Sequence, residues 1–505
     1  MKVLVANRGE IAVRILRACY ELGFDSVAVY TDVDEVGLHV RYANEAVAIG
    51  ATGNYLNIAA ILEAAHRSGA EAIHPGYGFL AENPAFAQAV EEDGMTFIGP
   101  RPETIALTGD KLAARQAARQ AGLPILAGSE SPLPLELSAE MAAQMNYPLL
   151  VKASAGGGGR GIRLAQSSKE LGEMVAAARH EALATFGNDS IYLEELVQPA
   201  RHIEVQILGD GLGGLLCLGE RECSIQRRRQ KLIEESPAHG LDPELRTAIQ
   251  EAALCLGKSL NYRSLGTIEF LLDSNHNFYF IEVNPRIQVE HPVTEMVTGI
   301  DLVKEQLILA AEGKLAVAQE EIHSHGAAIE ARILAEDTEA GFLPVTGEIT
   351  HLKEPSGPGV RFDSALYPGL PVTTHYDSLL AKVITWDRHR PGAIVRLSRS
   401  LNELKIGGVP TDVPFLLQII ESPSFISGKV DTTYLEHFTP PQEASEPDLE
   451  RELALATALY VHQQRQKSER NPAISSVQPS TLRPAPCADP WQVIAWREQF
   501  RGDVR

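Results

Sequence analysis

Cysteine is scarce in this 505-residue sequence, and long apolar runs are absent. The five cysteines form no Cys-x-x-Cys pair, and their odd number predicts free thiols in a reducing compartment. The first residues, MKVLVANRGE, become charged too early for a secretory signal, and no run approaches the length of a transmembrane helix. We therefore expect a cytoplasmic protein that makes no membrane contact.

Positive charge is also in short supply: 45 lysines and arginines stand against 66 acidic residues, a formal net charge of −21. This excess argues against non-specific binding to nucleic acid or to anionic membranes, because both partners are negatively charged. A local basic pocket for a phosphorylated substrate stays possible. Since 44% of the residues are hydrophobic, a chain of this length should form about three or four domains with apolar cores.

Two common nucleotide-binding fingerprints are missing. The first turn, residues 7–10, lacks Gly-x-Gly-x-x-Gly, and no P-loop occurs. Residues 1–110 nevertheless alternate short apolar strands with helical patterns, which predicts a parallel sheet covered by helices. The expected strands are residues 2–6, 26–30, 46–49, 72–74 and 96–98, and the expected helices are 10–22, 57–67 and 84–92. The turn at residues 74–78 follows a strand, where open sheets bind ligands, but a purely structural turn fits equally well.

A glycine-rich segment, residues 156–161, lies between strand patterns at residues 147–154 and 162–165. This arrangement predicts a hairpin flap, because a P-loop would need a following helix. Glycine backbone N–H groups can wrap phosphate, and Lys152 and Arg160 lie beside them, so the flap suits a lid over a nucleotide. A glycine-rich hairpin without a ligand is the alternative.

Further along, polar side chains occupy every second position, at Glu282, Asn284, Arg286, Gln288 and Glu290. Because strand side chains alternate, an extended segment would present all five on one face. A turn at residues 274–277 would pair this segment with a strand at 266–273 and place Glu269 opposite Glu282. Opposed carboxylates predict a positive group between them, most naturally a divalent cation held by oxygen ligands. A solvated charged face is the alternative, but the mixture of side chains favours a functional one.

A basic cluster at residues 224–231 (SIQRRRQK) holds four cations in eight residues. In an acidic protein it suits phosphate or carboxylate binding, and a surface basic patch is the alternative. The strand pattern at residues 327–334 then presents Glu330 and Arg332 on one side.

Taken in order, these motifs resemble the biotin carboxylase component of biotin-dependent carboxylases, within the ATP-grasp fold. The resemblance spans residues 1–440 and is carried by Ala6–Ala18, His74–Asn83, Phe97–Pro100, Gly109–Lys111, Val151–Gly161, Arg201–Gln206, Glu220–Lys231, Glu282–Glu295 and Glu330–Asp337. It implies a multidomain α/β and α+β fold. The implied parts are an N-terminal Rossmann-like (PreATP-grasp) domain at 1–110, an ATP-grasp domain at 111–320 with a mobile glycine-rich lid at about 124–196, a C-terminal biotin carboxylase domain at 321–440, and a linker and partner-docking tail at 441–505.

The resemblance also implies a set of site residues. ATP would be bound by Lys111, Lys152, Gly157, Gly158, Gly159, Glu194, Glu195, Val197, His202, Gln226, Glu269 and Glu282. Magnesium or manganese would be held by Glu269, Glu282 and Asn284. Bicarbonate and biotin would be bound by Lys231, Arg286, Gln288, Val289 and Arg332. Catalysis would fall to Glu290, Arg332, Arg286 and Lys231: Glu290 as the base that deprotonates bicarbonate, Arg286 holding its charge, Lys231 holding carboxyphosphate and Arg332 stabilising the biotin enolate.

Two departures from the family pattern concern the partners and the basic cluster. No Ala-Met-Lys-Met biotin-attachment signature occurs, so the biotin carrier protein must be another chain, alongside a carboxyltransferase subunit. Arg229 stands where the family commonly has histidine, which keeps a cation but removes a titratable group.

A homodimer is expected through positions matching Arg17, Glu21 and Arg361, although Pro358 departs from the bulky residue sometimes found there.

The tail beyond residue 440 resembles a shortened connector region of longer acyl-CoA carboxylase α subunits. A helix at 448–466 and the element containing Trp491 and Trp496 are expected to dock a carrier or carboxyltransferase subunit, and a floppy remnant is the alternative. The implied reaction is the first half-reaction of an acetyl- or propionyl-CoA carboxylase. The alternatives are another ATP-grasp carboxylate ligase and a non-catalytic nucleotide-binding scaffold.

Overall fold

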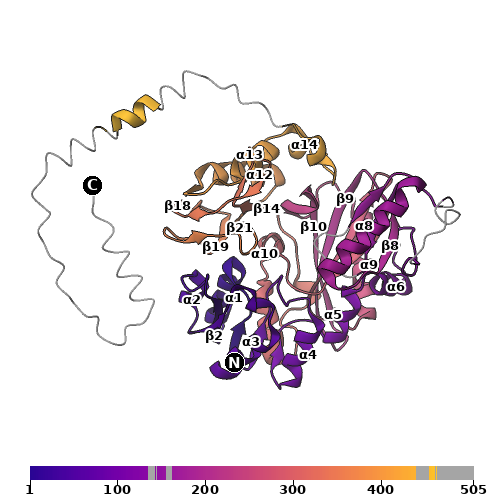
Figure 1. The fold of residues 1–505 in the computed structure, drawn as a ribbon, viewed down its shortest axis with the longest axis horizontal. Helices are drawn as coiled ribbons and strands as arrows, with labels where there is room; N and C mark the ends of the chain where they lie inside the picture. The colour runs from indigo at the N-terminus through magenta and orange to yellow at the C-terminus, as the bar shows by residue number, and fades with distance from the viewer. Residues whose placement is uncertain (135–142, 144, 155–161, 440–453, 461, 463–505) are drawn as a thin grey trace, which may run out of the picture. The chain divides into compact units, whose positions relative to one another are not determined.

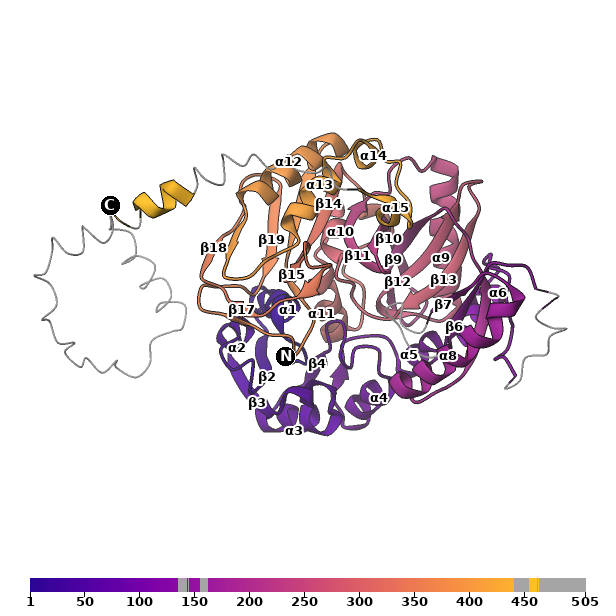
Figure 2. The ribbon, with the colours of Figure 1, turned by 45° about the horizontal axis from the view of Figure 1, so that its top comes forward.

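The computed structural model describes residues 1–134, 143, 145–154, 162–439, 454–460 and 462. The chain divides into two compact units, Met1–Thr439 and Pro440–Arg505. In the second unit, the described residues 454–460 and 462 are helical, within the helix expected at 448–466; Trp491 and Trp496 lie outside the described residues. Figures 1 and 2 show the elements of the first unit in chain order by colour.

The N-terminal part is a parallel five-stranded sheet with the order β3-β2-β1-β4-β5. Its strands are β1 Lys2–Val5, β2 Asp25–Thr31, β3 Glu45–Gly50, β4 Ala72–His74 and β5 Thr96–Phe97, and its helices are α1 Gly9–Glu21, α2 Leu38–Tyr42, α3 Ile58–Ser68 and α4 Pro84–Glu92, with a 3-10 turn at Thr52–Leu56. Val3 and Val5 pack with α1, whereas Leu4 packs with α3 and α4. The two faces are therefore covered by different helices, as the sequence pattern predicted.

Two helices, α5 Pro102–Gly109 and α6 Lys111–Gln120, lead to a small three-stranded sheet of order β7-β6-β8. Its elements are β6 Leu149–Ala153, β7 Arg163–Ala165, α8 Ser168–Phe186 and β8 Ile191–Glu195. Strands β6 and β7 are antiparallel, with Leu149 opposite Ala165. The expected hairpin is therefore present, while the glycines between its strands, Gly157 to Gly159 among them, lie outside the described residues.

The largest element is an eight-stranded sheet of order β13-β12-β9-β10-β11-β14-β21-β19, antiparallel throughout. Its strands are β9 Ala200–Asp210, β10 Leu215–Arg227, β11 Gln230–Ser236, β12 Arg263–Asp273, β13 Phe278–Asn284, β14 Ala327–Leu334, β19 Val360–Ser364 and β21 Leu379–Asp387. Helices α9 Pro243–Ser259, α10 His291–Thr298 and α11 Leu302–Glu312 lie along it, with a 3-10 turn at Gln319–Glu321. Because β14 pairs with β11, the sheet runs continuously through the boundary expected near residue 320.

The C-terminal part of the first unit packs helices on the far end of this sheet. These are α12 Arg390–Glu403, α13 Val413–Ile420, α14 Pro423–Ile426 and α15 Tyr434–His437. Short strand pairs complete it: β15 Glu336–Asp337 with β16 Leu343–Pro344, β17 Gly347–Glu348 with β20 Pro371–Val372, and β18 His351–Lys353 with β22 Lys405–Gly407. Leu397 and Leu401 of α12 and Leu416 of α13 belong to one buried apolar cluster with β14 and β21. Within the described residues, no helix combines the length and apolarity needed to cross a membrane.

One expectation about local structure is wrong. The period-two pattern predicted an extended segment up to Glu290, but β13 ends at Asn284 and helix α10 begins at His291 with Glu290 as its N-cap residue. Pro285 explains the end of the strand, since proline has no N–H to donate to a neighbouring strand. The polar residues beyond it come from an irregular turn.

Candidate active site

The β12–β13 hairpin positions the first two acidic residues, and the predicted pair forms: Glu269 lies opposite Glu282, although a register shift separates this pair from Phe270 and Phe280 nearer the turn. Each carboxylate has a cationic neighbour. Lys111 Nζ lies 3.4 Å from Glu282 Oε2, and Lys231 Nζ lies 2.9 Å from Glu269 Oε1. These cations offset the repulsion that two opposed carboxylates would otherwise cause.

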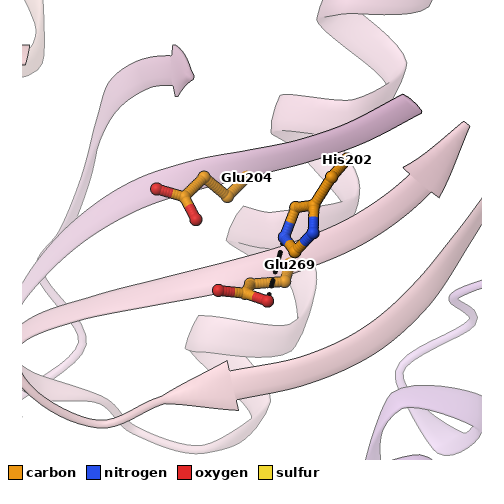
Figure 3. A group of neighbouring side chains, drawn as sticks. All are labelled: His202, Glu204 and Glu269. Atoms are coloured by element: carbon orange, nitrogen blue, oxygen red, sulfur yellow. Dashed lines mark ion pairs between the residues drawn. The ribbon is translucent and has the colours of Figure 1, made fainter. Parts of the chain in front are cut away.

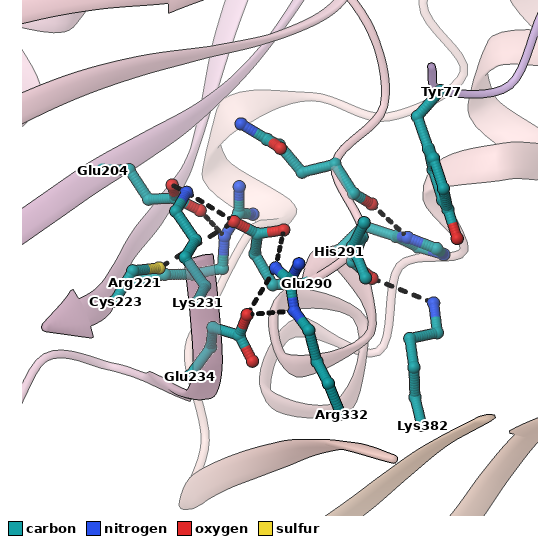
Figure 4. Close-up of polar contacts among 12 residues, drawn as sticks. Tyr77, Glu204, Arg221, Cys223, Lys231, Glu234, Glu290, His291, Arg332 and Lys382 are labelled. Atoms are coloured by element: carbon teal, nitrogen blue, oxygen red, sulfur yellow. Dashed lines mark hydrogen bonds and ion pairs between the residues drawn. The ribbon is translucent and has the colours of Figure 1, made fainter. Parts of the chain in front are cut away.

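Lys231, near the start of β11, is the centre of the polar network (Figure 4). Its Nζ lies 2.6 Å from Glu204, 2.9 Å from Glu269 and 2.6 Å from Glu290. All three glutamates are buried. Burial lowers the pKa of an ammonium group, but these carboxylates raise the pKa of Lys231 well above its ordinary value. One cation therefore joins acidic residues from β9, from β12 and from the start of α10.

Around Glu269, oxygen and nitrogen donors converge. His202 and Glu204 project from β9 and Glu269 from β12 (Figure 3), and one donor atom of each lies within 4.8 Å of the others. Glu269 Oε1 also accepts hydrogen bonds from Asn284 Nδ2 at 2.9 Å and Gln288 Nε2 at 3.3 Å. Burial raises the pKa of the Glu269 carboxyl, but its cationic neighbours hold that pKa well below its ordinary value. Glu204 and Glu269 supply carboxylate oxygens of the kind that a hard divalent cation binds, whereas Asn284 and Gln288 present NH₂ groups to Glu269.

Arg286 orients the turn that follows β13. Its Nε donates to Glu82 Oε1 at 2.5 Å, one Nη donates to Gln288 Oε1 at 2.9 Å, and the other donates to Asn284 Oδ1 at 3.2 Å. The amide oxygens of Gln288 and Asn284 are thereby turned toward Arg286, so that their NH₂ groups face Glu269. Arg286 also ties the turn to the N-terminal part, because Glu82 precedes α4.

Glu290 lies between two cations. It is fully buried, and its Oε1 and Oε2 lie 2.6 Å from Lys231 Nζ and 3.0 Å from Arg332 Nη2. Burial raises the pKa of a carboxyl, but Lys231, Arg332 and then Arg221 lower it, so the pKa of Glu290 lies well below its ordinary value. Glu290 is therefore a carboxylate that can accept a proton only weakly while both cations hold it.

Arg332 on β14 links Glu290 to a second acid. Its Nε donates to Glu234 Oε1 at 2.6 Å, which is possible because β14 pairs with β11 and lies beside it in the sheet. Burial raises the pKa of Glu234 to about 7, with Arg332 opposing this shift. The guanidinium itself stays charged, since carboxylates raise its pKa against the effect of burial.

Other expected ATP-binding residues lie in separate contacts. Glu194 on β8 is buried and accepts hydrogen bonds from Arg115 and Lys152. His202 and Gln226 share a contact of 2.9 Å between ring Nδ1 and amide Nε2. Glu195 is exposed and Val197 half-buried. One network thus contains the predicted residues Lys231, His202, Gln226, Glu269, Asn284, Arg286, Gln288, Glu290 and Arg332. Lys152 contacts Glu194, and Lys111 contacts Glu282, apart from it.

Four network members were missed in the sequence: Glu204, Arg221, Glu234 and Lys382. Glu204 could have been found, since it alternates with His202 on the same strand. Arg221 is wholly buried, donating to Glu204 Oε1 at 2.5 Å, and no local pattern distinguishes it from a surface arginine. Glu234 and Lys382 enter the network only through strand pairings far apart in the chain.

Comparisons with known proteins find relatives for most of the first unit. Family models match residues 1–105 (Biotin carboxylase, N-terminal domain), 110–318 (Carbamoyl-phosphate synthase L chain, ATP binding domain) and 330–437 (Biotin carboxylase C-terminal domain). Biotin carboxylase 1 of Bacillus subtilis is 48% identical over 442 residues, covering 86% of this chain and 98% of the relative. The chloroplastic biotin carboxylase of Arabidopsis thaliana is 47% identical over 450 residues, covering 88% of this chain and 84% of the relative.

Solved structures agree with these matches. A biotin carboxylase–beta-gamma-ATP complex from Campylobacter jejuni superposes with a TM-score of 0.84 at 43% identity and covers 86% of this chain and 98% of its own. The biotin carboxylase domain dimer of Hydrogenobacter thermophilus 2-oxoglutarate carboxylase, in complex with MgADP, ADP and bicarbonate, gives 0.84 at 46% identity, covering 86% and 97%. This chain belongs to the biotin carboxylase family, ATP-dependent ligases of the ATP-grasp fold.

Proposed function

We propose that this chain is the biotin carboxylase subunit of an acyl-CoA carboxylase. It would use ATP and bicarbonate to carboxylate biotin on a separate carrier protein, and a carboxyltransferase would pass the carboxyl group to an acyl-CoA. The observation that carries this proposal is the contact of Glu290 with both Lys231 and Arg332. A carboxylate between a phosphate-binding cation and an enolate-stabilising cation suits a reaction that deprotonates one substrate beside another.

ATP is proposed to bind with its phosphates near Lys111 and Lys152 and its base near Glu194, Glu195 and Val197. His202, Gln226, Glu269 and Glu282, with glycines 157–159, complete the proposed set. Glu269, Glu282 and Asn284 would hold Mg²⁺ or Mn²⁺; the two carboxylates fit this role, and Asn284 would have to turn its amide oxygen from Arg286 to the cation. The cation supplies charge neutralisation at the phosphates when it is bound. Lys111 Nζ lies 3.4 Å from Glu282, which places one lysine beside the proposed metal and phosphate region.

Bicarbonate is proposed to lie against Arg286, Gln288 and the backbone of Val289, with Glu290 as the base. The low pKa of Glu290 follows from its cationic neighbours, above all Lys231. When Lys231 turns to a phosphate oxygen, its hold on Glu290 weakens and the carboxylate becomes more basic. Glu290 would then take the bicarbonate proton, and the carbonate oxygen would attack the γ-phosphorus, forming carboxyphosphate and releasing ADP.

Biotin is proposed to react beside Arg332. Carboxyphosphate breaks into CO₂ and phosphate, the phosphate removes the N1′ proton of biotin, and N1′ then attacks CO₂. Arg332 would stabilise the enolate oxygen formed by deprotonation, since its guanidinium stays charged next to an oxyanion. Glu234, which holds Arg332 Nε at 2.6 Å, keeps the guanidinium pointed at this region.

The domain division proposed for this activity is 1–110, 111–320 and 321–440, with the lid at about 124–196 and a docking tail at 441–505. A homodimer is also proposed, by analogy with the domain dimer named for the Hydrogenobacter thermophilus structure. In this chain Arg361 pairs with Glu295 at 2.6 Å and with Asp363 at 2.7 Å, so a dimer contact through Arg361 would compete with these pairs.

The test is bicarbonate-dependent ATP cleavage by the purified chain, with and without free biotin and with a biotinylated carrier domain. We expect ADP release to need bicarbonate and carboxybiotin to form. Carbamate formation from ammonia without any biotin effect would support another ATP-grasp ligase instead. Nucleotide binding without turnover under all these conditions would support a scaffold subunit.

A further inference from the structure

Lys382 on β21 is a fully buried lysine to which the proposed reaction gives no role. Its Nζ donates a hydrogen bond to the backbone carbonyl of Val289 at 2.9 Å, and Figure 4 shows this amine beside the turn that leads into Glu290. In the sheet, Lys382 pairs with Arg332 on one side and with Asp363 on the other. Directly paired residues present their side chains on one face, so Lys382 shares the face of Arg332.

This position is unfavourable for a lysine unless acids compensate. A buried ammonium loses its hydration, and the guanidinium of Arg361 repels it. Glu10 Oε1 lies 3.2 Å and Asp363 Oδ2 3.9 Å from Lys382 Nζ. Burial lowers the pKa of Lys382, but Glu10, Glu330 and Asp363 raise it above its ordinary value. Lys382 is thus kept charged at a buried position where an apolar side chain would pack with a smaller free-energy cost of desolvation.

The preceding carbonyl of the same turn is held as well. His291 Nδ1 lies 2.7 Å from the Gln288 carbonyl oxygen, and His291 is fully buried. Burial lowers the pKa of His291 well below its ordinary value, and Lys382 adds to this shift, so the ring is neutral. A carbonyl oxygen only accepts, and Nδ1 therefore carries the hydrogen.

Holding these two carbonyls orients two N–H groups. In a trans peptide the carbonyl and the N–H of the same plane point in opposite directions. Because His291 donates a hydrogen bond to the Gln288 carbonyl, the Val289 N–H of the same peptide plane points away from His291. The grip of Lys382 on the Val289 carbonyl sets the next peptide plane, from which the Glu290 side chain leaves.

We propose that Lys382 is a positioning residue for bicarbonate. By donating to the Val289 carbonyl, Lys382 fixes the conformation of the Gln288–Glu290 turn. The Val289 N–H and the Glu290 carboxylate then both face the same bicarbonate ion. The inference rests on the proposed bicarbonate role of this turn. The ATP-binding residues Lys111 and Lys152 lie on other elements, so loss of Lys382 affects bicarbonate and leaves nucleotide binding intact.

The test is steady-state kinetics of Lys382→Met, a change that removes the charge and the donor but keeps the chain length. We expect kcat/KM for bicarbonate to fall by roughly 10-fold to 100-fold, the effect of a misplaced reacting group, while the KM for ATP changes less than about 2-fold. Lys382→Arg, which retains a charged donor, is expected to recover part of the loss. The matched control is Lys314→Met, because Lys314 is 72% exposed and pairs at the surface with Glu312 at 3.3 Å.

The outcomes separate this inference from the proposed function. If the wild-type protein shows no bicarbonate-dependent ATP cleavage, the proposed function is contradicted. An active wild type, with Lys382→Met showing an unchanged kcat/KM for bicarbonate or equal losses toward ATP and bicarbonate, would overturn the positioning role. If Lys382→Met does not give folded protein, Lys382→Gln, which removes the charge and shortens the side chain while keeping a polar group in the buried position, decides by the same comparison of bicarbonate and ATP kinetics.

Discussion

Replacing Lys231 with methionine (Lys231→Met) is expected to reverse how stability depends on pH at the active site. In the native protein the pKa values of Glu269 and Glu290 lie below the ordinary value of 4.5. Their contribution to stability is therefore present above pH 4.5 and is lost as the pH falls through the lower folded values. Methionine removes the shared cation and leaves the burial, which by itself raises the pKa of each buried carboxyl. Arg332 and Arg221 still lower the pKa of Glu290, and His202 still lowers that of Glu269.

The size of the effect follows from the geometry. Lys231 Nζ lies within 2.9 Å of three buried carboxylates, and removing one partner of a buried ion pair costs about 3–5 kcal/mol. In the variant, the folded pKa of Glu269 is expected to rise above the unfolded one, because Lys231 is its main cationic neighbour, whereas Glu290 keeps Arg332 and Arg221. The Glu269 carboxyl then contributes stability below the unfolded pKa, and that contribution is lost as the pH rises through the folded value. We therefore expect the full cost at about pH 8 and a smaller one at about pH 5.

Thermal unfolding over this pH range measures the effect, with Lys314→Met as the control lysine deletion. The difference in melting temperature between wild type and Lys231→Met should widen as the pH rises, whereas Lys314→Met should follow wild type throughout. A constant difference at every pH would refute the reasoning, because it would mean that the loss comes from packing and not from uncompensated carboxylates.

Three further predictions concern turnover and partners. Arg332→Ala should impair biotin carboxylation more than ATP binding, because its proposed charge partner is the enolate; equal losses, measured by carboxybiotin formation and nucleotide titration, would contradict this role. Glu290→Gln should lower bicarbonate-dependent ATP cleavage by about 10²–10⁴-fold, the usual contribution of a general base, while ATP affinity is retained; single-turnover assays with near-native rates would exclude Glu290 as the base. Deleting residues 445–505 should weaken capture of a carrier or carboxyltransferase subunit in a pull-down, and unchanged capture would remove the docking role of the tail.

Several features could be predicted because they depend on neighbours in the chain. The parallel sheet of residues 1–110 follows from short apolar strands alternating with amphipathic helices, and β4 and α4 have the bounds expected for them. The pairing of Glu269 with Glu282 was predicted from a symmetric hairpin, but it forms through a register shift between Glu269 and Phe270, because Phe270 pairs with Phe280 nearer the turn.

The same alternation gave a wrong prediction of the backbone conformation beyond Asn284. Five polar residues at even spacing looked like one strand face, yet Pro285 ends the strand and Glu290 caps a helix. The side chains still meet, because Arg286 and Gln288 bond each other across the turn and because Lys231 reaches both Glu269 and Glu290 from β11.

By itself the sequence determined which chemical groups are present and how they are spaced along single strands, turns and helices: the acidic hairpin, the glycine-rich segment, the basic cluster and the family that these motifs share. Only the tertiary structure decided which lysine or arginine forms an ion pair with which carboxylate. The order of strands in the eight-stranded sheet brings β11 beside β14 and β14 beside β21. This order places Lys231 and Arg332 beside Glu290 and Lys382 at the Val289 carbonyl. The physical reason is that strand order depends on pairing between distant segments, whereas alternation and turns depend only on adjacent residues.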